Sequence, residues 1–223
     1  MSGQLTRSDL KVLCGEWWFA MQDETGHQYG FCWYKVERRP PGVDVSWKLR
    51  LAFPGGSYEE DRTMVLDKAL QLVSASYSSG GDFCKGSVIG TRVEVLLGGS
   101  QPEKTSKTIS VDVPTDALPG MDFVMASWLP LVQGAELRYS GVNESAGFKL
   151  LGPHVLEVVG RETVQIGGAG VECWKVVRRP VEGTDSPGAL PLWLSDDHRI
   201  LMADWGGGNF MVIADKSAEA LFK

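Results

Sequence analysis

The sequence contains few of the residues that mark a metal centre or a nucleophilic active site. Its four cysteines stand at 14, 32, 84 and 173 with no Cys-x-x-Cys pair, and it has three histidines. No Gly-x-Ser-x-Gly or His-Glu-x-x-His motif occurs. Because metal ligands and catalytic nucleophiles usually come in such spacings, we expect no metal site and no bound cofactor. We expect the cysteines to be free and buried, although their number would also suffice for two disulfides.

The sequence also lacks long apolar runs and an excess of basic charge. No stretch approaches the roughly eighteen apolar residues of a membrane-spanning helix. Because 28 acidic residues outnumber 22 basic ones, the net charge is −6, and we expect neither a membrane span nor a nucleic-acid partner. The first residues, MSGQLTRSDLKVLCGEWW, lack the apolar segment of a signal peptide. This predicts a cytoplasmic protein, with a periplasmic location open if the sequence is a mature form.

Alternating hydrophobicity is the strongest structural signal that is present. In residues 43–53, VDVSWKLRLAF, apolar side chains occupy every second position. Side chains of a β-strand point alternately to its two faces, so this segment predicts a long strand with one buried face. Residues 91–97 and 108–114 show the same alternation over shorter lengths. The proline- and glycine-rich segments 40–42 and 54–57 predict tight connections on either side of the long strand.

The C-terminal part shows similar apolar segments separated by strong turn residues. Residues 189–214 predict three strands, joined by a turn at 195–198 and by a reversal at the three glycines 206–208. Residues 181–191, VEGTDSPGALP, predict a long surface loop rather than a domain boundary.

Helical signals are few, which decides the predicted fold class. Short helices are expected at 5–17, 119–131 and 216–222, and Pro130 should cut the second one short. We therefore predict a mainly β protein with two or three short helices. Residues 1–223 should form a single β-rich domain. Its strands should build one strongly curved antiparallel sheet, either a β-roll or a half-barrel like that of lipoprotein carriers.

A short sequence occurs twice, as GFCWYKVERRP at 30–40 and as GVECWKVVRRP at 170–180. Aligning the two copies requires one residue to be omitted from the second, and in a strand such an offset reverses which side chains face inward. One interpretation is two unrelated strands that end in solvated arginines and a proline. The other is that the strands lie close together, so that Arg38, Arg179 and their neighbouring arginines form an anion site.

Tryptophan is unusually frequent, with eight residues, five of them on predicted strands. Each of these could pack in the core, but together they could also line an apolar pocket in the concave face of a curved sheet. His198 stands in a polar turn that could also act as an acid or base. The candidate ligand-binding residues are Trp33, Tyr34, Arg38, Trp47, Trp174, Arg179, Trp193 and His198.

Two polar runs have simpler interpretations. The acidic run Glu59–Asp61 could bind a hard cation, but a row of adjacent acids is usually solvated. Asn143–Ser145 matches the glycosylation pattern, which matters only in a secreted protein.

Three functions fit these features. The first is a non-enzymatic protein that binds an apolar or amphipathic small molecule, or an apolar segment of a partner, in the concave face of its sheet. Its expected partner is a hydrophobic or acidic small molecule. The second is an isomerase, cyclase or lyase of secondary metabolism without a cofactor, in which Arg38, Arg179, Tyr34 or His198 supplies hydrogen bonds or protons. The third is a structural module whose sheet edge pairs with another chain. The oligomeric state is open.

Two resemblances bear on these alternatives. Residues 155–214, with VVGRETVQIGGAGVECWKVV and LPLWLSDDHRILMADW, resemble the C-terminal part of a bacterial family of unknown function, mostly exported proteins with a rolled antiparallel sheet. This resemblance implies the fold and no catalytic residues. YGFCWYKVER at 29–38 is similar to a stretch of the violacein-pathway enzyme that rearranges an indole-derived intermediate on a half-barrel. That likeness implies that a curved sheet can position a hydrophobic substrate for chemistry.

Overall fold

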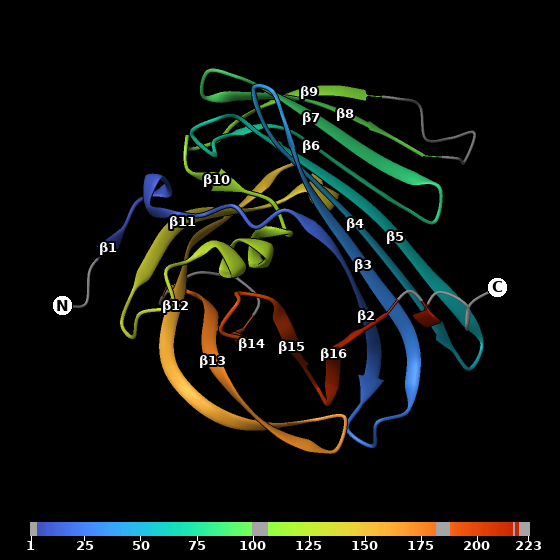
Figure 1. Ribbon diagram of the computed structural model, residues 1–223. Helices are drawn as coiled ribbons and strands as arrows, with labels where there is room; N and C mark the ends of the chain where they lie inside the picture. Colours follow the sequence, from blue (N-terminus) through green and yellow to red (C-terminus); the bar gives the residue numbers. More distant parts are fainter. Residues whose placement is uncertain (1–3, 100–106, 182–187, 216, 219–223) are drawn as a thin grey trace.

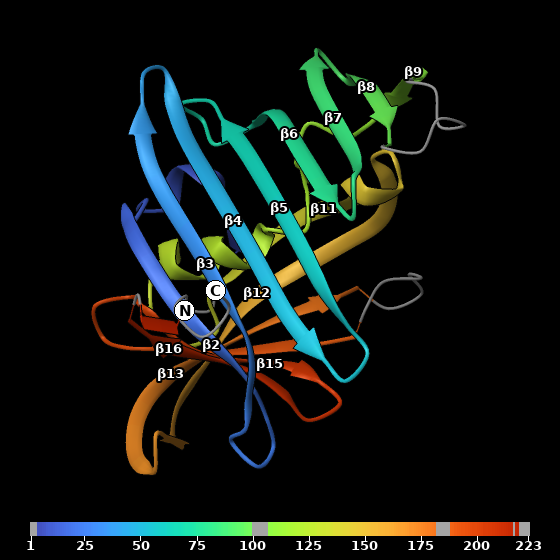
Figure 2. The ribbon, with the colours of Figure 1, turned by 90° about the vertical axis from the view of Figure 1, so that its right-hand side faces the viewer.

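The computed structural model describes residues 4–99, 107–181, 188–215 and 217–218, whose strands form one large curved sheet (Figures 1 and 2). In chain order the strands are β1 (Gln4–Leu5), β2 (Gly15–Asp23), β3 (Gln28–Arg39), β4 (Gly42–Phe53), β5 (Gly56–Leu66), β6 (Leu72–Ser79), β7 (Asp82–Ile89), β8 (Arg92–Gly98), β9 (Lys107–Asp112), β10 (Ala117–Leu118), β11 (Glu136–Asn143), β12 (Lys149–Ile166), β13 (Ala169–Pro180), β14 (Leu190–Leu194), β15 (Ile200–Gly206) and β16 (Asn209–Ala214).

The sheet consists of two meanders. The strand order is β1-β11-β12-β13-β14-β15-β16-β2-β3-β4-β5-β6-β7-β8-β9, so β11–β16 and β2–β9 each follow the chain and are joined by the antiparallel pair β16 and β2. At one edge β1 and β10 run parallel to β11. The path is open, with β9 at the other end. The prediction of a mainly β, curved sheet is confirmed, and the parallel edge pairs make it mixed rather than purely antiparallel.

The strand predicted from alternation at 43–53 is present as β4. Val43, Val45 and Trp47 are buried at 2%, 0% and 4% exposure. The alternation predicts burial less well toward the end of the strand, where Phe53 is 49% exposed. There Phe53 pairs with Gly56 at the β4–β5 turn, and residues 52–57 are all exposed.

The predicted turns are also present. At 195–198 the amide of His198 donates to the carbonyl of Ser195 over 2.9 Å, between β14 and β15. Gly206, Gly207 and Gly208 all have positive φ values, of 84°, 64° and 77°, which glycine adopts at little cost, and they reverse the chain between β15 and β16. Of the loop expected at 181–191, residues 182–187 lie outside the described part of the chain.

The helix predictions were less accurate. The helix expected at 5–17 is wrong: only η1 (Arg7–Asp9) is helical. The strand β2 begins at Gly15, and its alternate side chains Trp17, Phe19 and Met21 belong to the main core. The helix expected at 119–131 is present as η2 (Asp122–Trp128), a 3-10 helix that ends before Pro130. A third short helix, η3 (Glu144–Ala146), was not predicted. Most of 216–222 lies outside the described residues. No helix among the described residues is long and apolar enough to cross a membrane.

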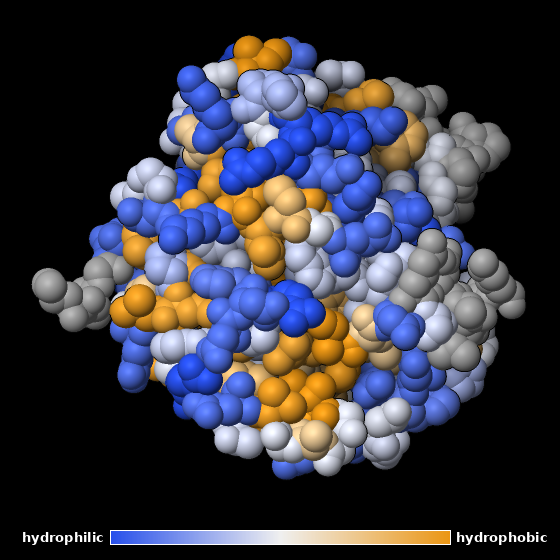
Figure 3. Space-filling view, in the orientation of Figure 1, coloured by the Kyte–Doolittle hydropathy of each residue, from blue (hydrophilic) through white to orange (hydrophobic). Residues whose placement is uncertain are grey.

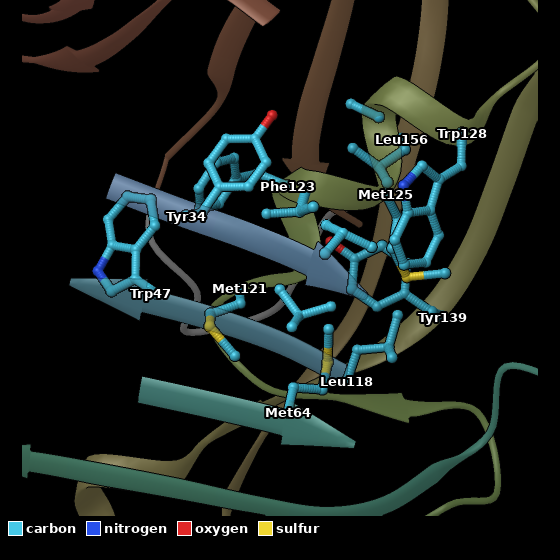
Figure 4. Close-up of a cluster of buried hydrophobic side chains, with 14 of the residues drawn as sticks. Tyr34, Trp47, Met64, Leu118, Met121, Phe123, Met125, Trp128, Tyr139 and Leu156 are labelled. Carbon is cyan, nitrogen blue, oxygen red and sulfur yellow. The ribbon is translucent and has the colours of Figure 1, made fainter. Parts of the chain in front are cut away.

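The segment around η2 fills the concave face of the sheet. Figure 1 shows this helix inside the curve formed by the strands, and all seven of its residues are buried. In Figure 4, Phe123 lies near Tyr34 and Trp47, while Trp128 and Met125 pack near Tyr139 from β11. Side chains of the chain itself therefore occupy the middle of the concave face.

The two copies of the repeated sequence lie on β3 and β13, which are separated in the sheet by β14, β15, β16 and β2. Of the two interpretations of the repeat, the one in which these strands lie close together is therefore wrong. The offset between the copies has the expected consequence. Cys32 belongs to the main core, whereas Cys173 belongs to a second, smaller cluster with Trp193 and Met202.

The cysteines, all within the described residues, are free. Cys32, Cys84 and Cys173 are buried as expected, but Cys14 is exposed, contrary to the prediction. It lies in the extended segment before β2, where the predicted helix is absent.

Candidate functional site

Two of the eight predicted ligand-binding residues come together in the core. The rings of Tyr34 and Trp47 both face Phe123 of η2, with centroid distances of 6.4 and 5.1 Å. Tyr34 is fully buried and also stacks on Phe19 of β2. These side chains pack the sheet against η2, and a ligand would have to displace η2 to reach them.

The other three tryptophans of the set are held at separate places by their indole N–H groups. Each donates to a carboxylate: Trp33 to Glu16 (2.8 Å), Trp174 to Asp196 (3.1 Å) and Trp193 to Glu162 (2.6 Å). The structure does not bring them into one pocket, because they lie on different strands and parities of the curved sheet.

The remaining candidates also lie apart. Arg179 forms an ion pair with Glu157 at 3.0 Å. His198 has a positive φ of 66° and serves the turn between β14 and β15. Arg38 lines a cavity that it shares with Arg7 and does not meet Arg179 there. The predicted convergence of these arginines is wrong, and the ligand-binding roles of all eight residues stay predictions.

A different cleft gathers charged and apolar side chains from several elements. We call it the Arg178 cleft and define it by Arg62 of β5, Val142 of β11, Glu144 of η3, Arg178 of β13, Leu190 of β14 and Trp205 of β15. Its volume is about 540 Å³, within the usual range for a small-molecule site.

Arg62 is held between two buried carboxylates. Its Nε lies 2.5 Å from Glu60 Oε1, and its Nη1 bonds to Glu144 Oε1. Burial alone would lower the pKa of Arg62, but the hydrogen bond to Glu60 and the charges of Glu144 and Glu60 raise it. Gly120 makes this arrangement possible, because a Cβ there would lie 2.3 Å from Arg62 Nη1. Its amide also donates to Glu144 Oε2 over 3.1 Å.

Arg178 is bound less completely. It is 8% exposed, and among the described residues it forms an ion pair with Asp122 alone, where Nη1 and Oδ1 lie 3.6 Å apart. That distance is too long for a good hydrogen bond. Within the described residues, neither Arg178 Nε nor Asp122 Oδ1 has a hydrogen-bond partner. Arg178 therefore has donor capacity that the protein does not use.

Behind Arg178 lies a buried pair of rings. The Tyr139 hydroxyl donates to Asp122 Oδ2 over 2.6 Å, and the His154 ring stacks on Tyr139 at 5.6 Å. Burial and the Asp122 charge raise the pKa of Tyr139 well above its usual range, which keeps the hydroxyl protonated as a donor. Burial lowers the pKa of His154, the charge of Asp122 opposes this, and the charge of Arg178 adds to it. These groups fix Asp122, which in turn positions Arg178.

Trp205 closes one side of the cleft. Its ring lies 5.5 Å from Phe123 and 6.2 Å from Trp47, and 37% of the residue is exposed. It therefore joins the buried aromatic cluster to the surface of the cleft. A molecule in the cleft would contact an indole on one side and Leu190 on another.

Sequence reasoning missed most of this site, though two signals were present. Arg178 shares its strand parity with the buried Val176, which is unusual for a solvated arginine. Glu60 likewise shares the parity of the buried Met64, and it is 5% exposed, so the prediction of a solvated run at 59–61 is wrong for this residue.

No comparable signal identifies Glu144. The run Asn143–Ser145 that contains it matched a glycosylation pattern. In the structure the Asn143 side chain accepts from the Ala146 amide over 3.3 Å and caps η3. Only the folded chain shows that Glu144 meets Arg62.

A second apolar space lies elsewhere on the surface. A groove of about 560 Å³ is lined by Ile166, Met202, Phe210 and Val212, with polar residues at the β2–β3 turn. Figure 3 shows hydrophobic surface toward the lower centre of the molecule, over the strands β15 and β16 of Figure 1. This groove contains no buried charged group comparable to Arg178 among the described residues, so it offers less to orient a ligand.

The chemistry available in the Arg178 cleft is hydrogen-bond donation and charge stabilisation. Across the described residues, no group of three or more His, Cys, Asp or Glu side chains is arranged to hold a metal ion. Two guanidinium groups face the cleft, and of the two Arg178 has unused donor capacity.

Comparisons with known proteins add little. No protein-family model matches the chain, and no curated protein matches it significantly. A DUF1089 family protein from Pseudomonas aeruginosa, of known structure, is similar with a TM-score of 0.39 and 13% sequence identity, over 79% of this chain and 90% of that chain. A similarity of this degree carries no argument about function. None of these comparisons supports the likeness of residues 29–38 to the violacein-pathway enzyme.

Proposed function

We propose that the protein binds an amphipathic small molecule in the Arg178 cleft, with a polar group that accepts hydrogen bonds from Arg178. The observation that supports this most directly is the incomplete bonding of a nearly buried guanidinium beside an open cleft. Leaving a buried charged donor without a partner costs about 1–3 kcal/mol or more. A carboxylate, carbonyl or hydroxyl of a ligand would recover part of that cost.

The apolar part of the ligand would contact Val142, Leu190 and Trp205. These side chains line the cleft beside the charged residues Arg62, Glu144 and Arg178. This arrangement is typical of sites that bury the apolar part of a ligand and orient it with a few polar groups. The proposed occupant is thus a hydrophobic molecule with an acceptor group, and the cleft replaces the centre of the concave face as the place where it binds.

Enzymatic activity is a second candidate, because charged side chains face the cleft. Arg178 could stabilise negative charge that develops on a substrate oxygen in an isomerase, cyclase or lyase reaction. Of Arg38, Arg179, Tyr34 and His198, the residues first considered for catalysis, none lines the Arg178 cleft. In this alternative Arg178 would take the role that was predicted for them.

A fluorescent amphiphile tests the proposal. We would titrate the protein with 8-anilinonaphthalene-1-sulfonate, an aromatic body with an acceptor group, and follow its fluorescence. Arg178→Gln should weaken binding about tenfold or more, the equivalent of about 1.4 kcal/mol from one lost charged hydrogen bond.

Arg179→Gln is the matched control, because this neighbouring arginine pairs with Glu157 and does not line the cleft. It should bind like the wild type. Equal binding by Arg178→Gln would contradict the proposal. Native mass spectrometry of the purified protein should identify any natural ligand, and its conversion during incubation would favour the enzyme.

A further inference from the structure

A second cavity has three cations and one carboxylate in its lining. We call it the Arg7 pocket and define it by Arg7, Leu10, Arg38, Val43, Asp67, Lys68 and Leu70. It lies between η1, the β3–β4 hairpin and the turn from β5 to β6, and its volume is about 330 Å³.

The cations of this pocket lack the partners that other arginines have. Every other arginine of the chain has a carboxylate within 4 Å, whereas Arg7 and Arg38 have none among the described residues. Arg38 and Lys68 form neither an ion pair nor a side-chain hydrogen bond with the described residues. The two unpaired arginines of an acidic protein thus line the same cavity.

Arg7 forms the inner wall of the pocket. Its Nη1 donates to the carbonyl of Leu70, while its Nη2 is buried without a partner among the described residues. Burial lowers the pKa of Arg7, and the charges of Asp116 and Asp67 oppose this. Burying a guanidinium with an unused donor is unfavourable unless something else accepts from it.

The acidic residues near the pocket are already engaged. Asp67 Oδ1 accepts from the amides of Ala69 and Gln71 at 2.8 and 2.9 Å and so stabilises the turn. Asp116, which does not line the pocket, accepts from the Ser140 hydroxyl over 2.9 Å. The lining therefore has three cations and one carboxylate, which is an excess of two positive charges. The negative charge of Asp116, outside the lining, partly offsets the charge of Arg7.

The wall of the pocket contains an uncommon backbone conformation. Leu70 has a positive φ of 58°, which is unfavourable for a residue with a branched side chain. Arg7 donates to its carbonyl, and the Leu70 amide donates to the carbonyl of Asp67 over 3.0 Å. Such residues are found preferentially where a binding site is held in a fixed shape.

From these observations we infer that the Arg7 pocket binds a small molecule through a phosphate or sulfate group, which accepts from Arg7 and pairs with Arg38 and Lys68. A dianion matches the excess positive charge of the lining, and guanidinium groups suit tetrahedral oxyanions. Leu10, Val43 and the Leu70 side chain offer apolar contact to the rest of the molecule. This site is separate from the Arg178 cleft and does not depend on its function.

Calorimetric titration with sodium phosphate at pH 7.5 tests the inference, with ionic strength held constant by sodium chloride. The wild type should show saturable binding that sodium acetate does not match. Arg38→Gln combined with Lys68→Gln should weaken phosphate binding about a hundredfold, roughly tenfold for each lost charge-assisted contact. Both residues lie at the rim, so this variant should fold normally, which circular dichroism would check.

The matched control is Arg138→Gln combined with Lys149→Gln, which removes the same charge from exposed positions outside the pocket. It should bind phosphate within about twofold of the wild type, the size of a general charge effect at this ionic strength. The inference is overturned if the wild type does not distinguish phosphate from acetate, if the Arg38/Lys68 variant binds as well as the wild type, or if both double variants lose binding equally. Tighter binding of hexyl phosphate than of phosphate would add support for apolar contact.

Discussion

The Arg178 cleft and the Arg7 pocket place arginines beside open space under different electrostatic conditions. In the cleft, Arg62 contacts Glu60 and Glu144, and Arg178 faces Asp122. All three carboxylates are at most 5% exposed. In the pocket no carboxylate of the described part of the chain lies within 4 Å of Arg7 or Arg38, and Lys68 is exposed.

The difference shows how burial decides whether a charge needs a partner. Removing a charge from water costs several kcal/mol, so a fully buried cation is usually found beside an anion. A cation at the rim of a pocket keeps most of its water and can stay unpaired at little cost. The charges of the cleft are therefore required by the fold, whereas those at the rim of the pocket remain available to a ligand.

The largest expected effect comes from removing a cation of the cleft. Arg62→Met leaves Glu60 and Glu144 buried without their common partner, which should lower the free energy of unfolding by about 3–5 kcal/mol. Urea denaturation measures this change. Arg38→Met at the rim of the pocket should change stability by less than about 1 kcal/mol. Similar losses in the two variants would remove the proposed distinction between the two sites.

A smaller effect should appear when the protein is acidified. Because burial lowers the pKa of His154 below its ordinary value of 6.5, the unfolded chain binds a proton here more readily than the folded one as the pH falls through 6.5. The stabilisation is present above pH 6.5 and is lost toward the lower folded pKa, with a slope of at most about 1.4 kcal/mol per pH unit.

Urea denaturation at pH 7.5 and at pH 5.5 would measure this loss. His154→Asn, which keeps an N–H near the Gly152 carbonyl, should reduce the difference between the two values. His27→Gln, at an exposed turn, should not reduce it. An unchanged difference in His154→Asn would show that the histidine behind Arg178 does not contribute.

The smallest effect concerns the unpaired cations of the pocket. If Arg7, Arg38 and Lys68 repel one another, sodium chloride should stabilise the protein by screening them, and Arg38→Gln should remove about 0.5 kcal/mol of that gain. Thermal denaturation at 0.05 and 0.5 M salt measures it. Arg138→Gln, which removes an arginine paired with Glu136, should leave the salt effect unchanged or increase it. A larger salt response in Arg38→Gln than in the wild type would argue against repulsion.

Much of the fold followed from local sequence patterns. Alternation predicted β4, turn residues predicted the reversals at 195–198 and 206–208, and Pro130 predicted the end of η2. The helix predicted at 5–17 failed because Trp17 and Phe19 alternate with polar or less buried neighbours and pack into the sheet. Tertiary burial of this kind overrides weak helix propensity.

The candidate site was much less predictable. The tryptophans were correctly placed on strands, but the segment around η2 fills the space that they were expected to line. Arg178, rather than Arg179, faces the cleft, and the offset between the repeated sequences pointed to opposite faces for these neighbours without showing which face is inside. The residues first considered for ligand binding are mostly packing residues or surface ion pairs.

The sequence by itself determined the long strand β4 with its buried face and the turns at 195–198 and 206–208, because backbone periodicity and the φ preferences of glycine act within a few residues. Only the tertiary structure decided which charges meet. Arg62 and Glu144 are 82 positions apart, and Arg7 and Leu70 are 63 apart. Such contacts depend on how two meanders curve around η2. Coulomb energy varies with the distance between charges in space, and the number of residues between them in the sequence does not reveal that distance.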